Sequence, residues 1–506
     1  MGAQVDYVLA IDQGTSSSRA VISDINGNIQ AAGSFPLGQT FPKNGWVEQD
    51  PEDIWTSSIQ ACRKAIDAFS GGIEDILAVG IANQRETVVV WNPETGEAYY
   101  NAIVWQDRRT ADRCDRLKLD PMSHTIREIT GLVIDPYFSS TKLEWLLDID
   151  HIRDAAQRGR LCFGTVDTFL IWRLTRGKIH ATDSTNASRT QLFDISKHNW
   201  SKPLLEFFDI PRSILPEIKE SVDDYGQTDK KWFGKSIPIL GVAGDQHASL
   251  LGQACIQRGM AKITYGTGCF ALVNTGKQKV RSKSDLLTTP AYRIEGQTNY
   301  AIEGSIFTAG SSIKWLRDSL GLIASSEETE KRAIRVNGDT RGVYIVPAFT
   351  GLGAPYWRPK VRGFVSGLTF ETNADHLSTA VLQSVAFQTY DLLEAMVADG
   401  ILPNIVRIDG GMAANNWFCQ FLTDILDIVV ERPQVIETTV RGAAYLALKG
   451  AAALDKFEDI AQVWSLDRRF ESRMPEGDRR ELVDGWKGCI EKALSFDERA
   501  SSAADK

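Results

Sequence analysis

The chain has 506 residues, a formal net charge of −9, and 43% hydrophobic and 24% charged residues. This composition is typical of a globular protein, and the length exceeds what one core holds, so we predict two domains, residues 1–254 and 255–506. The negative net charge and the absence of a strongly basic run argue against a nucleic-acid-binding protein. No apolar run is long enough to span a membrane.

The cysteines and the first residues indicate the compartment. Seven cysteines are scattered along the chain without Cys-x-x-Cys spacing, which favours free thiols over a disulfide framework or a zinc site. Residues 1–6 show no basic region followed by an apolar core, so we expect no signal peptide. These features predict a cytoplasmic protein.

The chain opens with a strand, a polar turn and a second strand. Residues 7–11 form an apolar run that predicts a buried strand, and residues 20–22 resume the apolar pattern. The polar octet between them, residues 12–19, therefore predicts the turn of a tight hairpin. Gly14 would let the backbone of this turn approach a ligand closely.

The side chains of this octet suit a phosphate group. Thr15, Ser16 and Ser17 offer hydroxyl and N–H donors, and Arg19 adds a planar cationic fork. Asp12 would repel phosphate unless a divalent metal lies between them. The alternative is a solvated hairpin in which Asp12 only caps the turn.

A second polar stretch ends the next predicted strand. Residues 76–82 form a buried strand, residues 83–87 are wholly polar, and residues 88–91 are again apolar. Ligand sites of α/β sheets lie at such strand ends. A plain hairpin turn is the alternative, yet Arg85 and Glu86 are not residues that turn geometry requires, so we favour a functional role.

The rest of the first half alternates helices and strands. Residues 51–69 and 142–147 have helical patterns, and Pro51 suits a first helical turn. Residues 237–244 predict a buried strand that runs directly into Asp245-Gln246-His247. A carboxylate again follows a buried strand, at the start of a predicted helix.

The second half repeats the theme of the first. The predicted strand of residues 261–265 leads into the Gly/Thr turn of residues 266–268, and residues 377–396 have helical periodicity. The strand of residues 405–408 is followed by the glycine pair 410–411, which permits close approach of a ligand. Phosphate-binding turns in both halves predict a nucleotide held in a cleft between two domains that move about a hinge.

Eight motifs carry a family resemblance and cover nearly the whole chain. They are Asp12-Gln-Gly-Thr-Ser-Ser-Ser-Arg19, Asn83-Gln-Arg-Glu-Thr87, Gly131-Leu-Val-Ile-Asp-Pro-Tyr-Phe138, Thr182-Asp-Ser-Thr-Asn-Ala-Ser-Arg-Thr190, Gly244-Asp-Gln246, Thr264-Tyr-Gly-Thr-Gly-Cys-Phe270, Pro347-Ala-Phe-Thr-Gly-Leu-Gly-Ala-Pro-Tyr-Trp357 and Asp409-Gly-Gly411. Their types and order resemble those of the glycerol kinases, which belong to the FGGY carbohydrate kinases of the actin-like ATPase superfamily.

The resemblance implies a fold and an activity. The fold is α/β, with two ribonuclease-H-like domains and an interdomain catalytic cleft, the first domain holding glycerol and phosphate and the second the nucleotide. The activity is phosphorylation of glycerol to sn-glycerol 3-phosphate by ATP with Mg²⁺, in glycerol uptake and catabolism, and ADP is the other product. A homo-oligomer, either a dimer or a tetramer, is also expected from the family.

The resemblance further assigns site residues, and the chemistry agrees, because each hydroxyl of a bound polyol needs a polar partner once water is excluded. The implied glycerol-binding residues are Arg85, Glu86, Tyr137, Asp245, Gln246 and Phe270. The implied nucleotide-binding residues are Thr15, Ser16, Ser17, Arg19, Thr267, Gly310, Lys314, Gly411 and Asn415. Asp245 would be the general base, with a helix N-cap as its alternative role, and Asp12 would position Mg²⁺ through water.

Some positions depart from the common pattern of glycerol kinases. Lys314, Ser184, His247 and Arg358 stand where Gln, Tyr, Gln and Asp are frequent. For His247 we favour a structural role at a helix start over that of a second base. Residues 230–235 lack the glycine-rich form linked to inhibition by fructose 1,6-bisphosphate, and they contain no phosphorylatable histidine. Neither form of family regulation is therefore expected.

Two other functions are alternatives to the glycerol kinase hypothesis. A related FGGY kinase could act on xylulose or erythritol, but sibling kinases usually differ at the Arg85-Glu86 pair and at the motif of residues 131–138. An actin-like filament protein or chaperone would use hinge closure itself as its output. Such an ATPase needs no second substrate pocket, so Asp245 and its neighbours argue against it.

Overall fold

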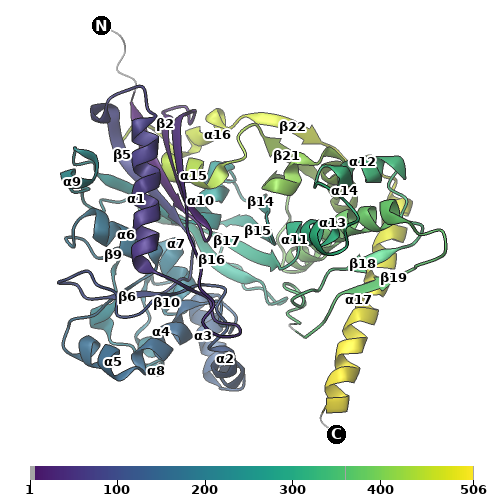
Figure 1. Ribbon diagram of the computed structural model, residues 1–506, viewed down its shortest axis with the longest axis horizontal. Coiled ribbons are helices and arrows are strands. Elements are labelled where there is room, and N and C mark those ends of the chain that lie inside the picture. The colour runs from purple at the N-terminus through teal and green to yellow at the C-terminus, as the bar shows by residue number, and fades with distance from the viewer. Residues whose placement is uncertain (1–5, 359, 505–506) are drawn as a thin grey trace.

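Two sheets, one in each half of the chain, form the framework of the protein (Figure 1). The computed structural model describes residues 6–358 and 360–504, so most of the segment expected to lack a signal peptide lies outside the described residues. Among the described residues, no helix combines the length and apolar character that crossing a bilayer requires.

The first sheet has five strands in the order β13-β5-β1-β2-β3. Its members are β1 (Tyr7–Gln13), β2 (Ser17–Asp24), β3 (Ile29–Pro36), β5 (Ile76–Asn83) and β13 (Ile239–Gly244). β1, β2 and β3 are antiparallel, whereas β5 runs parallel to β1 and β13 runs parallel to β5. Parallel strands end at the same edge of a sheet, so the polar residues after β5 and β13 lie side by side.

The opening hairpin is tighter than predicted. Asp12 and Arg19 are not turn residues but face each other across β1 and β2, and Gln13 pairs with Ser18. The amide of Gly14 donates to the carbonyl of Ser17 over 3.0 Å and closes the turn. The octet therefore extends both strands, because a short turn leaves its outer residues free to join the ladder.

The second sheet has seven strands in the order β16-β17-β15-β14-β20-β21-β22. Its members are β14 (Met260–Tyr265), β15 (Cys269–Gly276), β16 (Leu287–Ile294), β17 (Gln297–Ile306), β20 (Ile405–Asp409), β21 (Val429–Pro433) and β22 (Leu466–Phe470). β14, β15 and β17 are antiparallel, while β20 is parallel to β14 and β21 to β20. The central five strands thus repeat the pattern of the first sheet, as two related domains require.

The long helices follow the apolar periodicity of the sequence. α1 (Pro51–Asp67) begins at the predicted proline, and the Asp50 side chain caps it by accepting from the Glu52 amide. Further helices are α4 (Ser139–Leu147), α6 (Val166–Leu174), α10 (Asp245–Gly252), α13 (Ala374–Ala398), α14 (Asn416–Leu426), α15 (Thr438–Gly450) and α17 (Glu476–Ala504).

Shorter elements complete both halves. The short helices are α2 (Ala111–Lys118), α3 (Met122–Thr130), α5 (Asp150–Gln157), α7 (Ser184–Ala187), α8 (Lys202–Phe207), α9 (Lys230–Phe233), α11 (Gly310–Lys314), α12 (Glu328–Arg335) and α16 (Ile460–Val463). The short strands are β4 (Glu48–Gln49), β6 (Val89–Trp91), β7 (Ala102–Ile103), β8 (Cys162–Gly164), β9 (Ala181–Asp183), β10 (Phe193–Asp194), β11 (Asn199–Trp200), β12 (Glu217–Lys219), β18 (Tyr344–Val346) and β19 (Phe364–Ser366).

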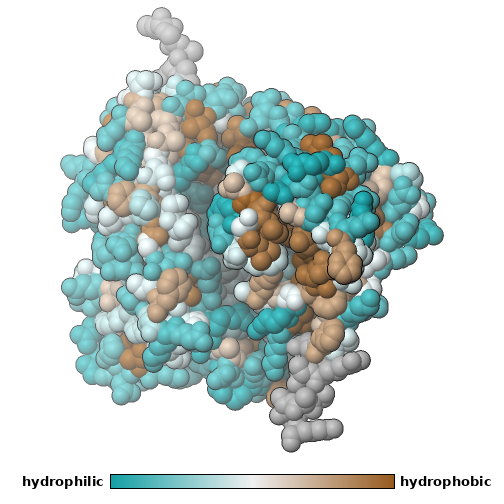
Figure 2. Space-filling view, turned by 45° about the vertical axis from the view of Figure 1, so that its right-hand side comes forward, coloured by the Kyte–Doolittle hydropathy of each residue, from teal (hydrophilic) through white to brown (hydrophobic). Residues whose placement is uncertain are grey.

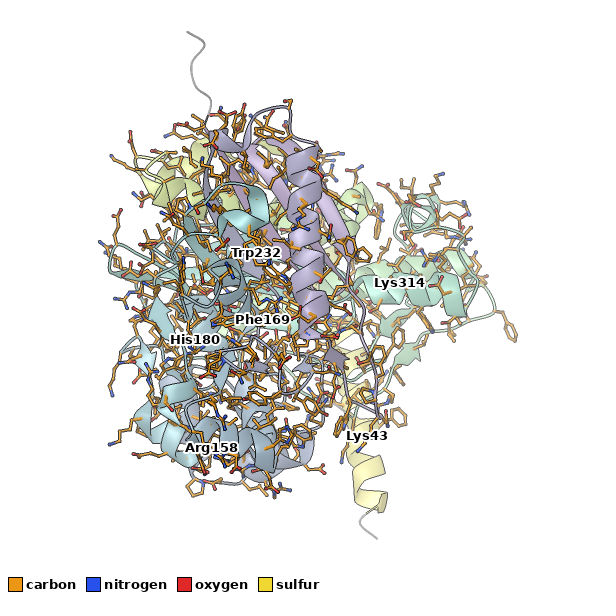
Figure 3. The ribbon with its side chains drawn as sticks, turned by 60° about the vertical axis from the view of Figure 1, so that its left-hand side comes forward. Lys43, Arg158, Phe169, His180, Trp232 and Lys314 are labelled. Carbon is orange, nitrogen blue, oxygen red and sulfur yellow. The ribbon has the colours of Figure 1, made fainter. Side chains whose placement is uncertain are left out.

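Separate apolar cores support the two sheets, and helices α10 and α15 pack against each other between them (Figure 1). In the first half, aromatic rings meet edge to face, with Trp91 on Phe169 and Trp55 on Trp232. Figure 3 shows Phe169 and Trp232 in this half. All seven cysteines are buried and unpaired, as predicted. The position of the domain boundary stays a prediction, since α15 comes from the second half yet packs on β1, β5 and β13.

Candidate active site

A small cavity lies where β5 and β13 end, facing the second half of the chain. It is lined by Thr15, Arg85, Glu86, Trp105, Tyr137, Asp245, Gln246 and Phe270. All six residues expected to bind a polyol thus meet in one place, although they come from four separate segments of the sequence. We call this space the polyol cavity.

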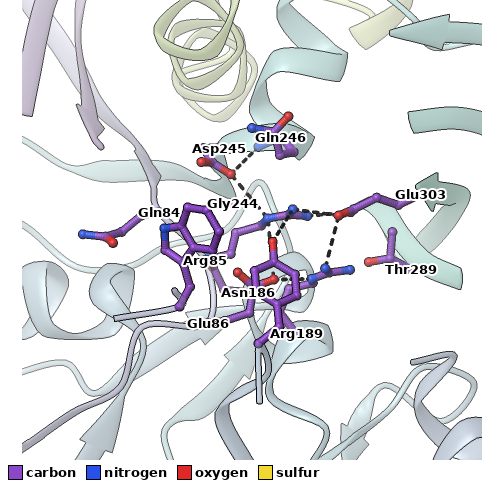
Figure 4. A network of polar contacts seen from close by, with 12 residues as sticks. Gln84, Arg85, Glu86, Asn186, Arg189, Gly244, Asp245, Gln246, Thr289 and Glu303 are labelled. Atoms are coloured by element: carbon purple, nitrogen blue, oxygen red, sulfur yellow. Dashed lines mark hydrogen bonds and ion pairs between the residues drawn. The ribbon is translucent and has the colours of Figure 1, made fainter. Parts of the chain in front are cut away.

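Arg85 lies at the centre of a buried charge network (Figure 4). Its two terminal nitrogens bind both carboxylate oxygens of Glu303, at 2.7 and 2.8 Å, and its Nε lies 3.3 Å from Oδ1 of Asp245. Arg189 donates through Nε to Glu86 over 2.6 Å and contacts Glu303 at 3.2 Å. Such pairing is what holds buried charges in a protein interior.

The network shifts the pKa values of Asp245 and Glu303 in opposite directions. Burial raises the pKa of Asp245, and the neighbouring Arg85 offsets only part of that increase. Burial also acts to raise the pKa of Glu303, but Arg189 and Arg85 outweigh it and the pKa falls below its usual value. Glu303 is therefore a fixed anion, whereas Asp245 is a better proton acceptor than an exposed aspartate.

Local backbone geometry presents Glu86 and Asp245 to the cavity. Glu86 has a φ of 63°, an uncommon value for a residue with a side chain, and Ser139 donates to its carbonyl over 3.0 Å. Asp245 is the first residue of α10, and its Oδ1 accepts from the amide of Gln246 over 2.6 Å. Asp245 therefore stands at the start of a helix and also lines the polyol cavity, so the two predicted roles of this residue do not exclude each other.

Several residues of the site were missed at the sequence level. Trp105 forms a wall of the polyol cavity and donates through Nε1 to the hydroxyl of Thr15 over 3.0 Å. Lys262, fully buried on β14, donates to Oε1 of Gln246 over 2.6 Å. Glu303 and Arg189 were also missed. A buried charge in an apolar strand, as at Lys262 and Glu303, was the available signal.

A larger cavity of about 460 Å³ lies in the second half. Five of the residues predicted to bind the nucleotide line it, namely Thr267, Gly310, Lys314, Gly411 and Asn415. Gly310 is required here, because a Cβ atom would lie 2.5 Å from the carbonyl oxygen of Gly266. Figure 3 shows Lys314 in this half, across from the core of the first. We call this space the nucleotide cavity.

The remaining predicted phosphate-binding residues lie on the opposite side of the cleft. Figure 2 shows the hollow between the two halves. Thr15 and Ser16 lie in the turn between β1 and β2, and Ser17 is the first residue of β2. Arg19 of β2 makes an ion pair with Glu437, which precedes α15. None of these four residues lines the nucleotide cavity in this structure.

Asp12 is the predicted partner of a metal ion. Burial raises the pKa of its carboxyl to about 7, Asp245 adds to the increase, and Arg19 opposes it. Among the described residues, no group of three or more His, Cys, Asp or Glu side chains could hold a metal ion by itself. Two neighbouring carboxylates still fit Mg²⁺, which takes one or two protein carboxylates and completes its shell with water and phosphate.

Two of the unusual positions have structural roles. His247 is fully buried, burial keeps its pKa well below the usual value, and its Nε2 lies 3.1 Å from the hydroxyl of Thr289. Ser184 is buried in α7, where its hydroxyl donates to the carbonyl of Lys219 over 3.2 Å. Neither lines the polyol cavity.

Comparison with known families decides the classification. The sequence model of the FGGY family of carbohydrate kinases matches with its N-terminal domain at residues 7–252 and with its C-terminal domain at residues 261–451. The chain belongs to the FGGY family of carbohydrate kinases. The expectation of a kinase with two related α/β domains is thereby confirmed.

Individual FGGY proteins narrow the comparison. Glycerol kinase 1 of Pseudomonas aeruginosa is 53% identical over 490 residues, which is 97% of this chain and 99% of that protein. A glycerol kinase of Caldanaerobacter subterraneus is 52% identical over 494 residues, with 97% and 99% coverage. The crystal structure of Plasmodium falciparum glycerol kinase with ADP superimposes with a TM-score of 0.92 at 35% identity, covering 97% and 98% of the two chains. The expected resemblance to glycerol kinases is confirmed.

More distant FGGY structures share the fold alone. The xylulose kinase of Lactobacillus acidophilus superimposes with a TM-score of 0.87 at 20% identity, covering 98% and 99% of the two chains. The fold is therefore common to kinases of several substrates, and the substrate must be argued from the polyol cavity.

Proposed function

We propose that the protein transfers the γ-phosphoryl group of ATP to a terminal hydroxyl of glycerol, giving sn-glycerol 3-phosphate and ADP. The convergence of all six predicted polyol-binding residues on one cavity carries this proposal. The cavity is small, about 40 Å³ against about 460 Å³ for the nucleotide cavity, which favours a three-carbon polyol over a pentulose. The identity of more than 50% to glycerol kinases supports the same substrate.

The roles of the residues follow from their chemistry. Arg85 and Glu86 hold hydroxyls as donor and acceptor, and Phe270 and Trp105 exclude water from the carbon skeleton. Asp245 accepts the proton of the attacking hydroxyl, for which its raised pKa suits it. The oxygen of that hydroxyl then forms the bond to phosphorus as the bond to ADP breaks, and Asp245 later releases the proton to solvent.

The nucleotide is proposed to bind across the cleft. Its base and ribose occupy the nucleotide cavity, with Gly310, Lys314, Gly411 and Asn415 around them, while Thr15, Ser16, Ser17, Arg19 and Thr267 contact phosphate oxygens. Bound Mg²⁺, positioned by Asp12, would neutralise charge on the phosphates. Closure of the two halves is needed for all of these residues to reach one ligand.

The first experiment measures MgATP-dependent ADP release with glycerol, dihydroxyacetone, erythritol, xylulose and ribulose, beside the variant Asp245→Asn. We expect turnover of glycerol to be fastest and to fall about 10²-fold or more in the variant, because general base catalysis is lost. ATP binding, measured by calorimetry, should persist in the variant. Preference for a pentulose would overturn the glycerol assignment, and an active Asp245→Asn would overturn the base assignment. The homo-oligomer and the cytoplasmic location stay predictions.

A further inference from the structure

A second large cavity lies in the C-terminal half, outside the proposed active site. Its volume is about 510 Å³, within the range of small-molecule sites, and it shares no lining residue with the polyol or nucleotide cavity. Its walls come from the loop before β18, from α13 and α14, and from the segment around the start of α17. The proposed kinase reaction makes no use of it.

The walls of this cavity combine acidic and aromatic side chains. Four carboxylates line it, on Asp339, Asp424, Asp478 and Glu481, and no lysine or arginine does. Trp417 and Phe421 stack with ring centroids 5.2 Å apart and nearly parallel planes. The combination of aromatic faces and carboxylates attracts a positively charged group.

The nearby arginines do not neutralise this charge. Arg479 forms an ion pair with Asp427 at 2.8 Å, and Arg480 forms one with Glu476, also at 2.8 Å. Within residues 6–358 and 360–504, the side-chain carboxylates of Asp478 and Glu481 make no hydrogen bond or ion pair. Their charge is therefore available to a ligand.

A buried amide gives independent evidence of a ligand. Gln383 lines the cavity with only 2% of its surface exposed, and its Nε2 donates to the carbonyl of Gly338 over 2.8 Å. That bond fixes the orientation of the amide, because a carbonyl can only accept. Oε1 of Gln383 then has no hydrogen-bond partner among the described residues. An unpaired buried acceptor costs free energy, and an N–H donor in the cavity would satisfy it.

We propose that this cavity binds an organic cation, specifically an aliphatic amine with two ammonium groups. One ammonium group would lie against Trp417 and donate to Gln383, and the other would lie between Asp478 and Glu481 at the opening. A diamine suits the site because its apolar carbon chain matches the aromatic wall between two charged ends.

The cavity also adjoins the nucleotide cavity. The amide of Trp417 donates to Oε1 of Glu330 over 3.2 Å, and Glu330 lines the nucleotide cavity together with Asn415. A cation bound to Trp417 would therefore affect the position of the first turn of α14, which begins beside the nucleotide cavity. This coupling rests on the proposed kinase function, whereas binding of the cation does not.

Isothermal titration calorimetry of the full chain with putrescine tests the binding. We expect a single site that Asp478→Asn/Glu481→Gln weakens about tenfold, since two charged partners are lost. The matched control is Glu476→Gln/Asp484→Asn, which removes the same charge from α17 outside the cavity and should change the affinity less than about twofold. Gln383→Met should also weaken binding, and urea unfolding will verify that this variant is folded.

The outcomes are separable. Absence of binding, equal binding of uncharged 1,4-butanediol, or equal weakening in both double variants would overturn the cation site. In the second measurement, putrescine should change the KM for ATP of the native chain but not of Asp478→Asn/Glu481→Gln, at constant ionic strength. Binding without any change in KM would overturn the coupling alone. Failure of the kinase assay would leave the calorimetric result standing.

Discussion

The residues of the polyol cavity depend on charges that are far apart in the sequence. Arg85, Arg189, Glu86 and Glu303 are each at most 2% exposed, so each charge needs its partners inside the protein. Glu303 is central to this charge pairing, because it contacts both arginines. It lies on β17 of the second sheet. Arg85, which we propose binds the substrate, is thus oriented by the opposite half of the chain.

We predict that Glu303→Gln raises the KM for glycerol about tenfold or more and affects kcat less. The neutral amide cannot hold Arg85 through two charged hydrogen bonds, so the guanidinium loses its fixed orientation. Steady-state kinetics across glycerol concentrations will measure the effect. Glu295→Gln, an exposed position in the same β16–β17 hairpin, is the control. An unchanged KM in Glu303→Gln would show that Arg85 is positioned without this carboxylate.

A second buried carboxylate predicts a pH dependence of stability. Asp391 accepts from Trp486 Nε1 over 2.7 Å and from the Tyr356 hydroxyl over 2.9 Å, and burial raises its pKa to about 7 from the usual 3.8. The folded state therefore binds one proton more than the unfolded state between these pH values. The free energy of unfolding should consequently fall as pH rises from about 4 to about 7.

The variant Asp391→Asn isolates this contribution. Urea unfolding of both proteins at pH 5 and pH 8 measures the difference in the free energy of unfolding. We expect the native chain to lose up to about 3 kcal/mol relative to the variant over this range, since about two pH units of it lie below the folded pKa and each corresponds to about 1.4 kcal/mol. Parallel pH profiles would contradict the raised pKa.

At the scale of elements, helices α10 and α15 cross beside the end of the first sheet that carries Asp245, the proposed general base. α10 begins with Asp245, and glycines allow it to touch α15. A Cβ atom on Gly442 would lie 1.8 Å from the carbonyl oxygen of Ala248, and one on Gly252 would lie 1.9 Å from that of Thr438. The close crossing thus exists only because these positions carry no side chain.

We predict that Gly442→Ala lowers the free energy of unfolding by about 2–3 kcal/mol and reduces kcat. The added methyl group must push α10 away from α15, which costs overpacking energy and shifts Asp245. Gly488→Ala in α17 is the matched control, because a Cβ atom there meets nothing within 4 Å and alanine favours a helix. Chemical denaturation and steady-state kinetics measure both effects. Equal stability of the two variants would show that the crossing can relax.

The elements themselves were largely predictable, because periodicity and capping act over short distances. The β5 strand, the start of the α1 helix at Pro51 and the strand-to-helix step at Asp245 all follow from local patterns. The limits of the opening hairpin could not be predicted from local patterns. Polar residues such as Asp12 and Arg19 are typical of turns, although here they belong to the strands.

At the scale of the whole molecule, the sequence shows which residues are unusual but not which of them meet. Glu303 binds Arg85, which lies 218 positions earlier in the chain, and no local pattern reports such a contact. The predicted site residues were found through the family motifs, whereas Glu303, Arg189 and Lys262 lie outside the six positions assigned to glycerol. Their contacts become visible only when the two halves of the chain are brought together in the folded structure.

The ion pair between Arg19 and Glu437 joins the two halves at the proposed phosphate site. Arg19 cannot bind Glu437 and a phosphate oxygen equally well, so ATP must compete with the carboxylate for the guanidinium. We predict that Glu437→Gln lowers the KM for MgATP about two- to fivefold, because a partly exposed ion pair contributes up to about 1 kcal/mol. Glu471→Gln, which removes an exposed partner of Arg469, is the control.

Steady-state kinetics with varied MgATP at saturating glycerol gives the KM values, and calorimetry with ADP checks them without turnover. The effect should shrink as salt is raised, because ions screen an exposed pair. A KM that rises in Glu437→Gln would mean that the carboxylate orients Arg19 for phosphate instead of withholding it. That result would move Glu437 into the proposed phosphate site, and closure of the cleft would then strengthen this contact and not break it.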